Sequence, residues 1–151
     1  MTTWLEEVEA LTLKGQIAVP YRWWVGEVGS CFLTALRDEK KILGNRCSQC
    51  GTVYVPPRKN CGRCFRDIDE WVELGNEGIV TAHTIVRFSY PLQPVKSPFA
   101  YALIKLDGAD VCLMHIVKEN LDRLKNGVRV RARFKEERSG QLLDIDAFDL
   151  V

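Results

Sequence analysis

The sequence has no long apolar segment. Its 151 residues contain no run of 18 or more apolar positions, and no charged stretch at the N-terminus is followed by an apolar one. Neither a membrane span nor a signal peptide is therefore indicated. With 46% hydrophobic and 27% charged residues, the chain is expected to fold into one ordinary domain or two small ones and to be cytoplasmic.

A large net charge is also lacking. The 21 lysines and arginines nearly balance the 20 aspartates and glutamates, which leaves a formal charge of +1. Such a chain has no overall electrostatic attraction to nucleic acid.

Familiar catalytic motifs are absent from the sequence as well. It contains no glycine-rich phosphate loop, serine nucleophile elbow or paired-carboxylate motif. His83 and His115 lie in strand patterns, where a histidine is more often a hydrogen-bonded structural residue than a base. A nucleophilic pair of Cys31 or Cys112 with either histidine is an alternative, although the apolar run around Cys112 disfavours a thiolate. We therefore expect no catalytic residues in this chain.

What the sequence does contain is two Cys-x-x-Cys knuckles separated by ten residues. Four thiolates at this spacing can surround one metal ion, and zinc accepts them without a redox change or a geometric preference. The sequence thus predicts a compact structural zinc site, with iron as a minor alternative and two disulfides or a redox pair less favoured. The predicted ligands are Cys47, Cys50, Cys61 and Cys64.

A site with four thiolate ligands is coordinatively closed. It has no open position for water or substrate, so metal catalysis is not expected there. We interpret the zinc as a structural staple and look for the function elsewhere in the chain.

The N-terminal segment, residues 1–40, is predicted to be helical. One helix is expected to begin near Thr3 and a second at Ser30, with residues 19–25 between them. Two short helices make a poor core of their own, so the aromatic side chains between them pack either against the rest of the chain or against a partner. Their composition is that of an interface hot spot; they are Tyr21, Trp23 and Trp24.

The zinc ribbon is placed at residues 41–70, with a short strand over 52–55, and a β-rich domain at residues 71–151. From Trp71 onward apolar residues alternate with polar ones, which predicts strands, and a short helix is expected over 119–125. About five strands with a helix before the last hairpin are typical of an OB-fold barrel. The predicted strands are 71–74, 79–90, 99–106, 111–117, 128–137 and 142–150.

Four cations alternate along the strand predicted over 128–137, namely Arg129, Arg131, Arg133 and Lys135. A basic strand on an OB-fold raises the hypothesis of a single-stranded nucleic-acid binder. A two-residue turn at Ser139-Gly140 would instead pair these cations with carboxylates of the last strand. The expected opposed pairs are Lys135 with Asp144, Arg133 with Asp146, Phe134 with Ile145 and Ala132 with Ala147, with a bulge or strand end near Val130.

The order of these parts resembles the zinc-ribbon/OB-fold acyl-CoA-associated proteins, small companions of thiolases and related acyl-CoA enzymes. The resemblance covers nearly all of residues 21–151. It implies a mainly β fold with N-terminal helices, in which a rubredoxin-like zinc ribbon precedes a five-stranded OB-fold barrel. The motifs that carry it are Arg46-Cys-Ser-Gln-Cys-Gly51, Pro56-Pro-Arg58, Cys61-Gly-Arg-Cys64, Trp71, Gly78 and Pro98-Phe-Ala-Tyr101.

The resemblance further implies a non-catalytic subunit in a hetero-oligomer with a thiolase-fold chain that carries the nucleophilic cysteine. In such a complex, cations could contact the phosphates of coenzyme A, and aromatic loops could exclude water from the thioester. Candidate phosphate contacts are Arg58, Lys59 and Arg87, and candidate covering residues are Phe88 and Tyr90. The alternative interpretation of these five residues is that they are ordinary surface charges and loop aromatics.

Overall fold

Helix α1 (Gly26–Glu39) is the first helix or strand in the described part of our computed structural model, which covers residues 12, 15, 19–93 and 95–151. Phe32, Ala35 and Leu36 lie on its buried face, as spacings of three and four residues dictate. The helix begins four residues before the expected Ser30. Ser30 does not cap the helix, since its hydroxyl donates to the Gly26 carbonyl at 2.7 Å within the helix. The helix predicted near Thr3 lies outside the described residues.

A three-stranded antiparallel sheet follows the helix, in the order β2-β1-β3. It consists of β1 (Ile42–Arg46), β2 (Val53–Tyr54) and β3 (Glu70–Leu74). The two cysteine knuckles lie between these strands, the first between β1 and β2 and the second between β2 and β3. Strand β1 was not predicted from the sequence. We call this sheet with its knuckles the ribbon.

The second sheet has five antiparallel strands in the order β6-β5-β4-β7-β8. Gly78 is required where β4 crosses β5, since a Cβ atom there would lie 2.9 Å from the Cα of Leu106. This mainly β architecture, with a ribbon before a five-stranded barrel, confirms the fold class predicted from the sequence. The strands are β4 (Glu77–Val86), β5 (Phe99–Leu106), β6 (Leu113–Val117), β7 (Arg129–Phe134) and β8 (Ile145–Leu150).

The prediction of a short helix over residues 119–125 is wrong. This connection between β6 and β7 consists of turns. Asn120 has a left-handed φ of 54°, and the Arg123 N–H donates to its carbonyl at 3.0 Å. A single residue in this conformation interrupts a helix of only seven residues before it can form.

The last hairpin differs from its predicted register. Phe134 does face Ile145, but a bulge then shifts the pairing by one residue, so that Ala132 faces Phe148. The bulge lies closer to the turn than expected, and as a result buried Val130 faces Leu150 and not a carboxylate. The connection is not a two-residue turn, because the 3-10 helix η2 (Leu142–Asp144) lies within it.

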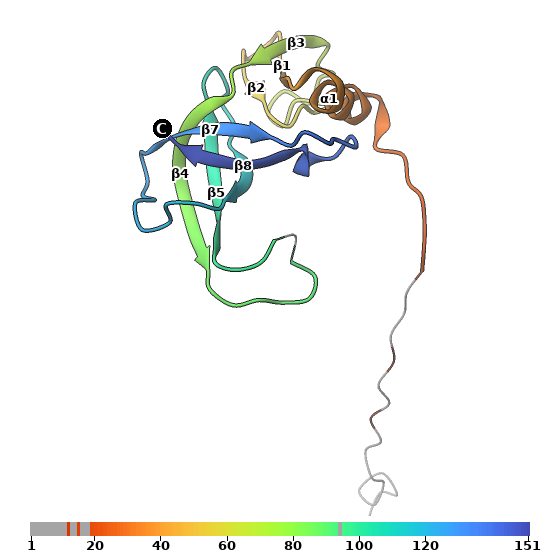
Figure 1. Cartoon of the computed structure of the whole chain (residues 1–151). Coiled ribbons are helices and arrows are strands. Elements are labelled where there is room, and N and C mark those ends of the chain that lie inside the picture. The colour runs from red at the N-terminus through yellow and green to blue at the C-terminus, as the bar shows by residue number, and fades with distance from the viewer. Residues whose placement is uncertain (1–11, 13–14, 16–18, 94) are drawn as a thin grey trace, which may run out of the picture.

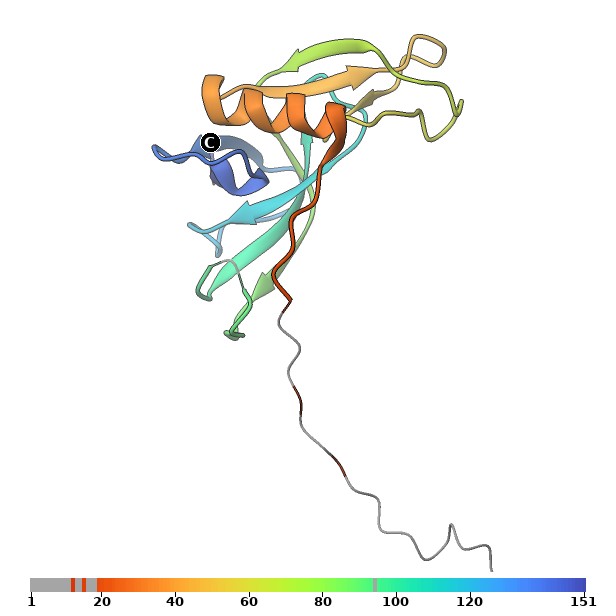
Figure 2. The ribbon, with the colours of Figure 1, turned by 90° about the vertical axis from the view of Figure 1, so that its right-hand side faces the viewer.

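One hydrophobic core joins the helix, the ribbon and the barrel. Phe32 of α1 and Ile42 of β1 belong to the same buried cluster as Val80 and Phe148 of the barrel. Figure 1 shows the ribbon and α1 at one end of the barrel, and Figure 2 shows α1 lying along the ribbon strands. A second, small cluster surrounds the knuckles. Within the described part of the chain, no helix is long and apolar enough to cross a membrane.

Candidate functional site

The four knuckle cysteines converge on one point of the ribbon. The sulfur atoms of Cys47, Cys50, Cys61 and Cys64 all lie within 4.8 Å of one another. Cys47 and Cys61 are buried, whereas Cys50 and Cys64 are half-buried. The arrangement matches the ligand set expected for one tetrahedral metal ion.

The two knuckles share the same backbone hydrogen bonds. In the first, the N–H of Gly51 donates to the carbonyl of Cys47 at 2.8 Å, and in the second the N–H of Phe65 donates to the carbonyl of Cys61 at 2.9 Å. The N–H of the first cysteine of each knuckle then bonds a carbonyl five residues later, at 3.0 Å for Cys47 and 2.8 Å for Cys61. The repeated pattern holds both sulfur pairs in equivalent orientations.

Tyr54 completes the surroundings of the second knuckle. Its hydroxyl lies 3.3 Å from the Cys61 sulfur and accepts the Gly62 N–H at 3.2 Å. The Tyr54 hydroxyl, with backbone N–H donors, lowers the pKa of Cys61 to about 6, while the neighbouring Cys50 sulfur raises the pKa of Cys64 to about 12. Four thiolates this close together repel one another unless a cation lies among them, so the donor set fits a divalent metal.

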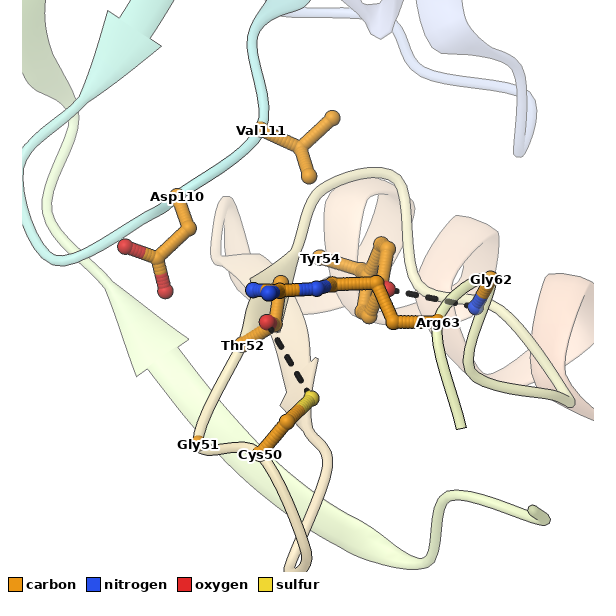
Figure 3. A pocket seen from close by; sticks show the side chains of 8 residues that line it. All are labelled: Cys50, Gly51, Thr52, Tyr54, Gly62, Arg63, Asp110 and Val111. Atoms are coloured by element: carbon orange, nitrogen blue, oxygen red, sulfur yellow. Dashed lines mark hydrogen bonds between the residues drawn. The ribbon is translucent and has the colours of Figure 1, made fainter. Parts of the chain in front are cut away.

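A cavity of about 720 Å³ lies beside this centre, between the ribbon and the β5–β6 connection. Figure 3 shows the Arg63 side chain extending across it toward Thr52, with Asp110 opposite. The Asp110 carboxylate accepts the Val53 N–H at 2.9 Å, and this bond ties the barrel to the ribbon. The Asp110 carboxylate therefore has a structural role, whereas the Arg63 guanidinium faces the cavity.

The five candidate coenzyme A contacts fall into two separate groups. Arg58 and Lys59 are exposed on the ribbon, and the Arg58 guanidinium lies 5.4 Å from the centre of the Tyr54 ring. Arg87, Phe88 and Tyr90 are exposed on the β4–β5 loop, at the end of β4 remote from the ribbon (Figure 1). The structure does not bring the two groups into one site, and coenzyme A binding by these residues stays a prediction.

The basic strand β7 is neutralised by carboxylates. Arg129 bonds Asp107 at 2.7 Å and Glu77 at 2.8 Å. The Arg129 guanidinium holds the pKa of both carboxyls below their usual range. Arg131 also pairs with Glu77. These contacts leave the two arginines little free charge for nucleic acid.

The ion pair predicted between Arg133 and Asp146 is confirmed at 3.2 Å. Lys135 lies opposite Asp144 as predicted, since its backbone N–H donates to the Asp144 carbonyl at 2.9 Å, but among the described residues no ion pair joins the two side chains. Asp144 is buried, and its carboxylate accepts three backbone N–H groups of the preceding turn, from Ser139, Gly140 and Gln141. It is a turn cap, while Lys135 is exposed.

The histidines and the remaining cysteines do not form a catalytic pair within the described residues. Buried His115 bonds the Leu142 carbonyl at 3.2 Å, and burial lowers its pKa. His83 bonds the Asn126 side chain at 3.0 Å. Cys112 lies beside Thr81, at 3.5 Å between sulfur and hydroxyl oxygen. Both histidines have the structural role expected from their strand positions.

The aromatic residues before α1 do not pack into the core. Tyr21, Trp23 and Trp24 are 77%, 70% and 75% exposed. The interpretation that they complete the core of this chain is therefore wrong, because none of the three belongs to either buried cluster. Phe65, at the end of the second knuckle, is another exposed aromatic residue, and sequence reasoning missed it.

Two family models match the chain in series. Residues 34–70 match the rubredoxin-like zinc ribbon domain of ChsH2, and residues 71–135 match the C-terminal OB-fold domain of ChsH2. The chain belongs to the ChsH2 zinc-ribbon/OB-fold family. The family match and the four-cysteine cluster together support a structural zinc ion in this ChsH2-type chain.

Relatives and solved structures agree with this assignment. The ChsH2-type chain is 28% identical over 101 residues to a DUF35 domain-containing scaffold protein of Methanocaldococcus jannaschii. The aligned region covers 66% of this chain and 72% of the relative. A crystal structure of a DUF35-family protein of unknown function from Sulfolobus solfataricus matches with a TM-score of 0.61 and 29% identity, over 78% of this chain and 80% of the other.

The Ltp2-ChsH2(DUF35) aldolase also matches, with a TM-score of 0.61 and 23% identity, over 79% of this chain and 92% of that chain. At this identity the match establishes the fold alone.

Proposed function

We propose that this chain is a non-catalytic accessory subunit of a thiolase-type acyl-CoA enzyme complex. The observation that carries the proposal is the exposed aromatic segment, residues 21–24. Fully burying a Phe, Tyr or Trp side chain removes about 150–250 Å² from water, so three such residues exposed to 70–77% present roughly 350–500 Å² of mainly apolar surface. This equals the largest apolar patch of an ordinary monomer, and such patches mark interaction sites.

The composition of the segment favours a protein partner. Tryptophan, tyrosine and arginine are the residues most enriched in interface hot spots, and Arg22 lies between Tyr21 and Trp23. The segment is extended, without helix or strand, so its backbone can follow the surface of a partner.

The relatives support the same role. The relative from Methanocaldococcus jannaschii is described as a scaffold protein, which is a non-catalytic role. A chain of this fold also occurs in the Ltp2-ChsH2(DUF35) aldolase. On this proposal a thiolase-fold partner supplies the nucleophilic cysteine and its acid and base, and our chain supports assembly and the access of acyl-CoA.

The parts of the chain then have separate tasks. The N-terminal segment (1–40) binds the partner, the zinc ribbon (41–70) is stapled by zinc on Cys47, Cys50, Cys61 and Cys64, and the OB-fold (71–151) carries the β4–β5 loop. The narrower form of the proposal is the small subunit of a 2-benzoylsuccinyl-CoA thiolase in anaerobic aromatic degradation, acting in the cytoplasm.

The test is to identify the neighbouring gene and to co-express this chain with a thiolase-fold chain. We expect the two chains to co-purify, and thiolytic activity to disappear when either is omitted. Replacing Trp23 and Trp24 with alanine should weaken the complex at least about tenfold. The matched control is Met114→Ala, which removes a 59% exposed apolar side chain from β6. Full activity from the large chain alone would refute the proposal, as would salt-dependent retention of this chain on single-stranded DNA without any thiolase-fold partner.

A further inference from the structure

The two knuckles share the same backbone hydrogen bonds but carry different residues at the left-handed position that follows the second cysteine. Gly51 follows the last cysteine of the first knuckle with a φ of 73°, and Phe65 occupies the equivalent place in the second with a φ of 58°. This left-handed conformation is natural for glycine and sterically disfavoured for a bulky side chain. The second knuckle thus keeps a residue that its own backbone does not favour.

The Phe65 side chain gains no compensating burial within this chain. It is 82% exposed and belongs to neither hydrophobic cluster, whereas Phe32, Phe99 and Phe148 are buried. In the isolated chain, both the exposure of the aromatic ring to water and the strained backbone are unfavourable. Both costs are offset if the ring is covered in a complex.

The charges around Phe65 indicate what covers it. Arg63 and Arg66 are exposed, two residues before and one residue after Phe65 in the sequence. Neither forms an ion pair with any residue that the structure describes, in contrast to the arginines of β7. An exposed aromatic ring and two arginines without ion-pair partners on the same knuckle have the composition of an interface hot spot. The carboxylates of Asp67 and Asp69 follow directly and would repel a phosphate backbone, which favours a protein over a nucleic acid.

We infer that Phe65 anchors this chain in an apolar socket of the thiolase-fold partner, and that carboxylates at the rim of that socket pair with Arg63 and Arg66. The inference rests on the proposed accessory function and adds a second contact, on the ribbon, to the aromatic segment before α1. It also gives the metal centre a task beyond stability. Because Phe65 directly follows Cys64, the zinc fixes the position of the anchor.

Phe65→Gly separates binding from folding. Glycine adopts the left-handed φ freely, so the zinc content and the melting temperature of the isolated variant should not fall. The Kd for the purified thiolase-fold chain should nevertheless rise at least about tenfold, while that of the Met114→Ala control stays within about twofold. A Phe65→Gly chain that keeps its zinc and binds within about twofold of the wild type overturns the inference.

Two further variants keep the test decisive. Phe65→Asn, which also tolerates this backbone, should lose affinity in the same way and replaces Phe65→Gly if that variant loses zinc. The double charge reversal Arg63→Glu with Arg66→Glu should weaken binding and remove its dependence on salt; unchanged binding contradicts the assigned carboxylates.

The wild type provides the reference for both proposals. If it binds through Trp23 and Trp24 but not through Phe65, only this inference fails. If it binds no thiolase-fold chain, the proposed function fails with it. Retention on single-stranded DNA that depends on Phe65 would identify the knuckle as a nucleic-acid contact and also overturn the inference.

Discussion

Replacing Asp144 with asparagine tests how the connection between β7 and β8 is held. One carboxylate oxygen, Oδ1, accepts the Ser139 N–H at 3.0 Å, and the other, Oδ2, accepts those of Gly140 and Gln141 at 2.7 and 3.1 Å. An asparagine keeps one acceptor oxygen. With that oxygen in the place of Oδ2, the bonds from Gly140 and Gln141 are kept, and the buried Ser139 N–H faces an amide N–H₂ and loses its acceptor.

The expected cost is about 1.5–3 kcal/mol of unfolding free energy. A hydrogen bond to a charged group contributes about 1.5–3 kcal/mol, and one such bond, from the Ser139 N–H, is lost. This is a large part of the roughly 5–15 kcal/mol by which a domain is stable.

The effect should depend on pH in one direction. Burial alone would raise the pKa of Asp144, but the N–H groups of Ser139, Gln141 and Gly140 outweigh it and lower the pKa. A carboxyl with a lowered folded-state pKa stabilises the fold above its unfolded pKa of about 3.9, and the gain is lost as the pH falls through the folded value. The difference between wild type and variant should thus be equal at pH 7 and 5 and shrink only below about pH 4.

Urea unfolding of the zinc-loaded protein, followed by far-UV circular dichroism, measures the change. Lys135→Ala and Asp38→Asn serve as controls and should each change stability by less than about 0.5 kcal/mol, since both act at exposed side chains. An Asp144→Asn protein within about 0.5 kcal/mol of the wild type would refute the cap. If Lys135→Ala lowers the free energy of unfolding as much as Asp144→Asn does, the result would support the ion pair predicted from the sequence.

Two further predictions concern the ribbon and its junction with the barrel. Chelation of zinc, or Cys61→Ser, should speed amide hydrogen exchange in residues 47–52 and 61–68, while the barrel strands keep their protection. The reason is that the knuckles form a small buried cluster of their own, whereas the ribbon strands belong to the main core. An equal loss of protection in the barrel strands would contradict this prediction. Gly78→Ala should lower the free energy of unfolding by about 1–3 kcal/mol, since the added Cβ would press on Leu106. The control Gly75→Ala has open space around it and should lower the free energy of unfolding by less than about 0.5 kcal/mol. Urea unfolding measures both changes.

The metal centre could be predicted because its signal is local. A Cys-x-x-Cys spacing already fixes two sulfurs in one turn of chain, so only the meeting of the two turns depended on the fold. The strands of the barrel were found for a similar reason, and β5 (Phe99–Leu106) has the predicted bounds, since alternation of apolar and polar residues directly reports a strand with one buried face.

The last hairpin could not be predicted in the same way. A one-residue bulge changes every later pair, and whether it forms depends on which residue must face the core, here Val130 against Leu150. The hydrogen-bond partners of Asp144 depend on the same connection, because the backbone N–H groups of a turn lie closer to a carboxylate within that turn than a lysine side chain does.

The sequence by itself determined the four-cysteine ligand set, the β-rich fold and the absence of a familiar catalytic motif, because each of these depends on local residue spacing or on composition. Only the tertiary structure decided which aromatic residues remain uncovered. Tyr21, Trp23, Trp24 and Phe65 have the same chemistry as the buried aromatic residues, and their exposure follows from what α1 and the barrel leave without a packing partner. Burial is a property of the whole packed chain, so the surfaces assigned here to a partner could be recognised only after the core was in place.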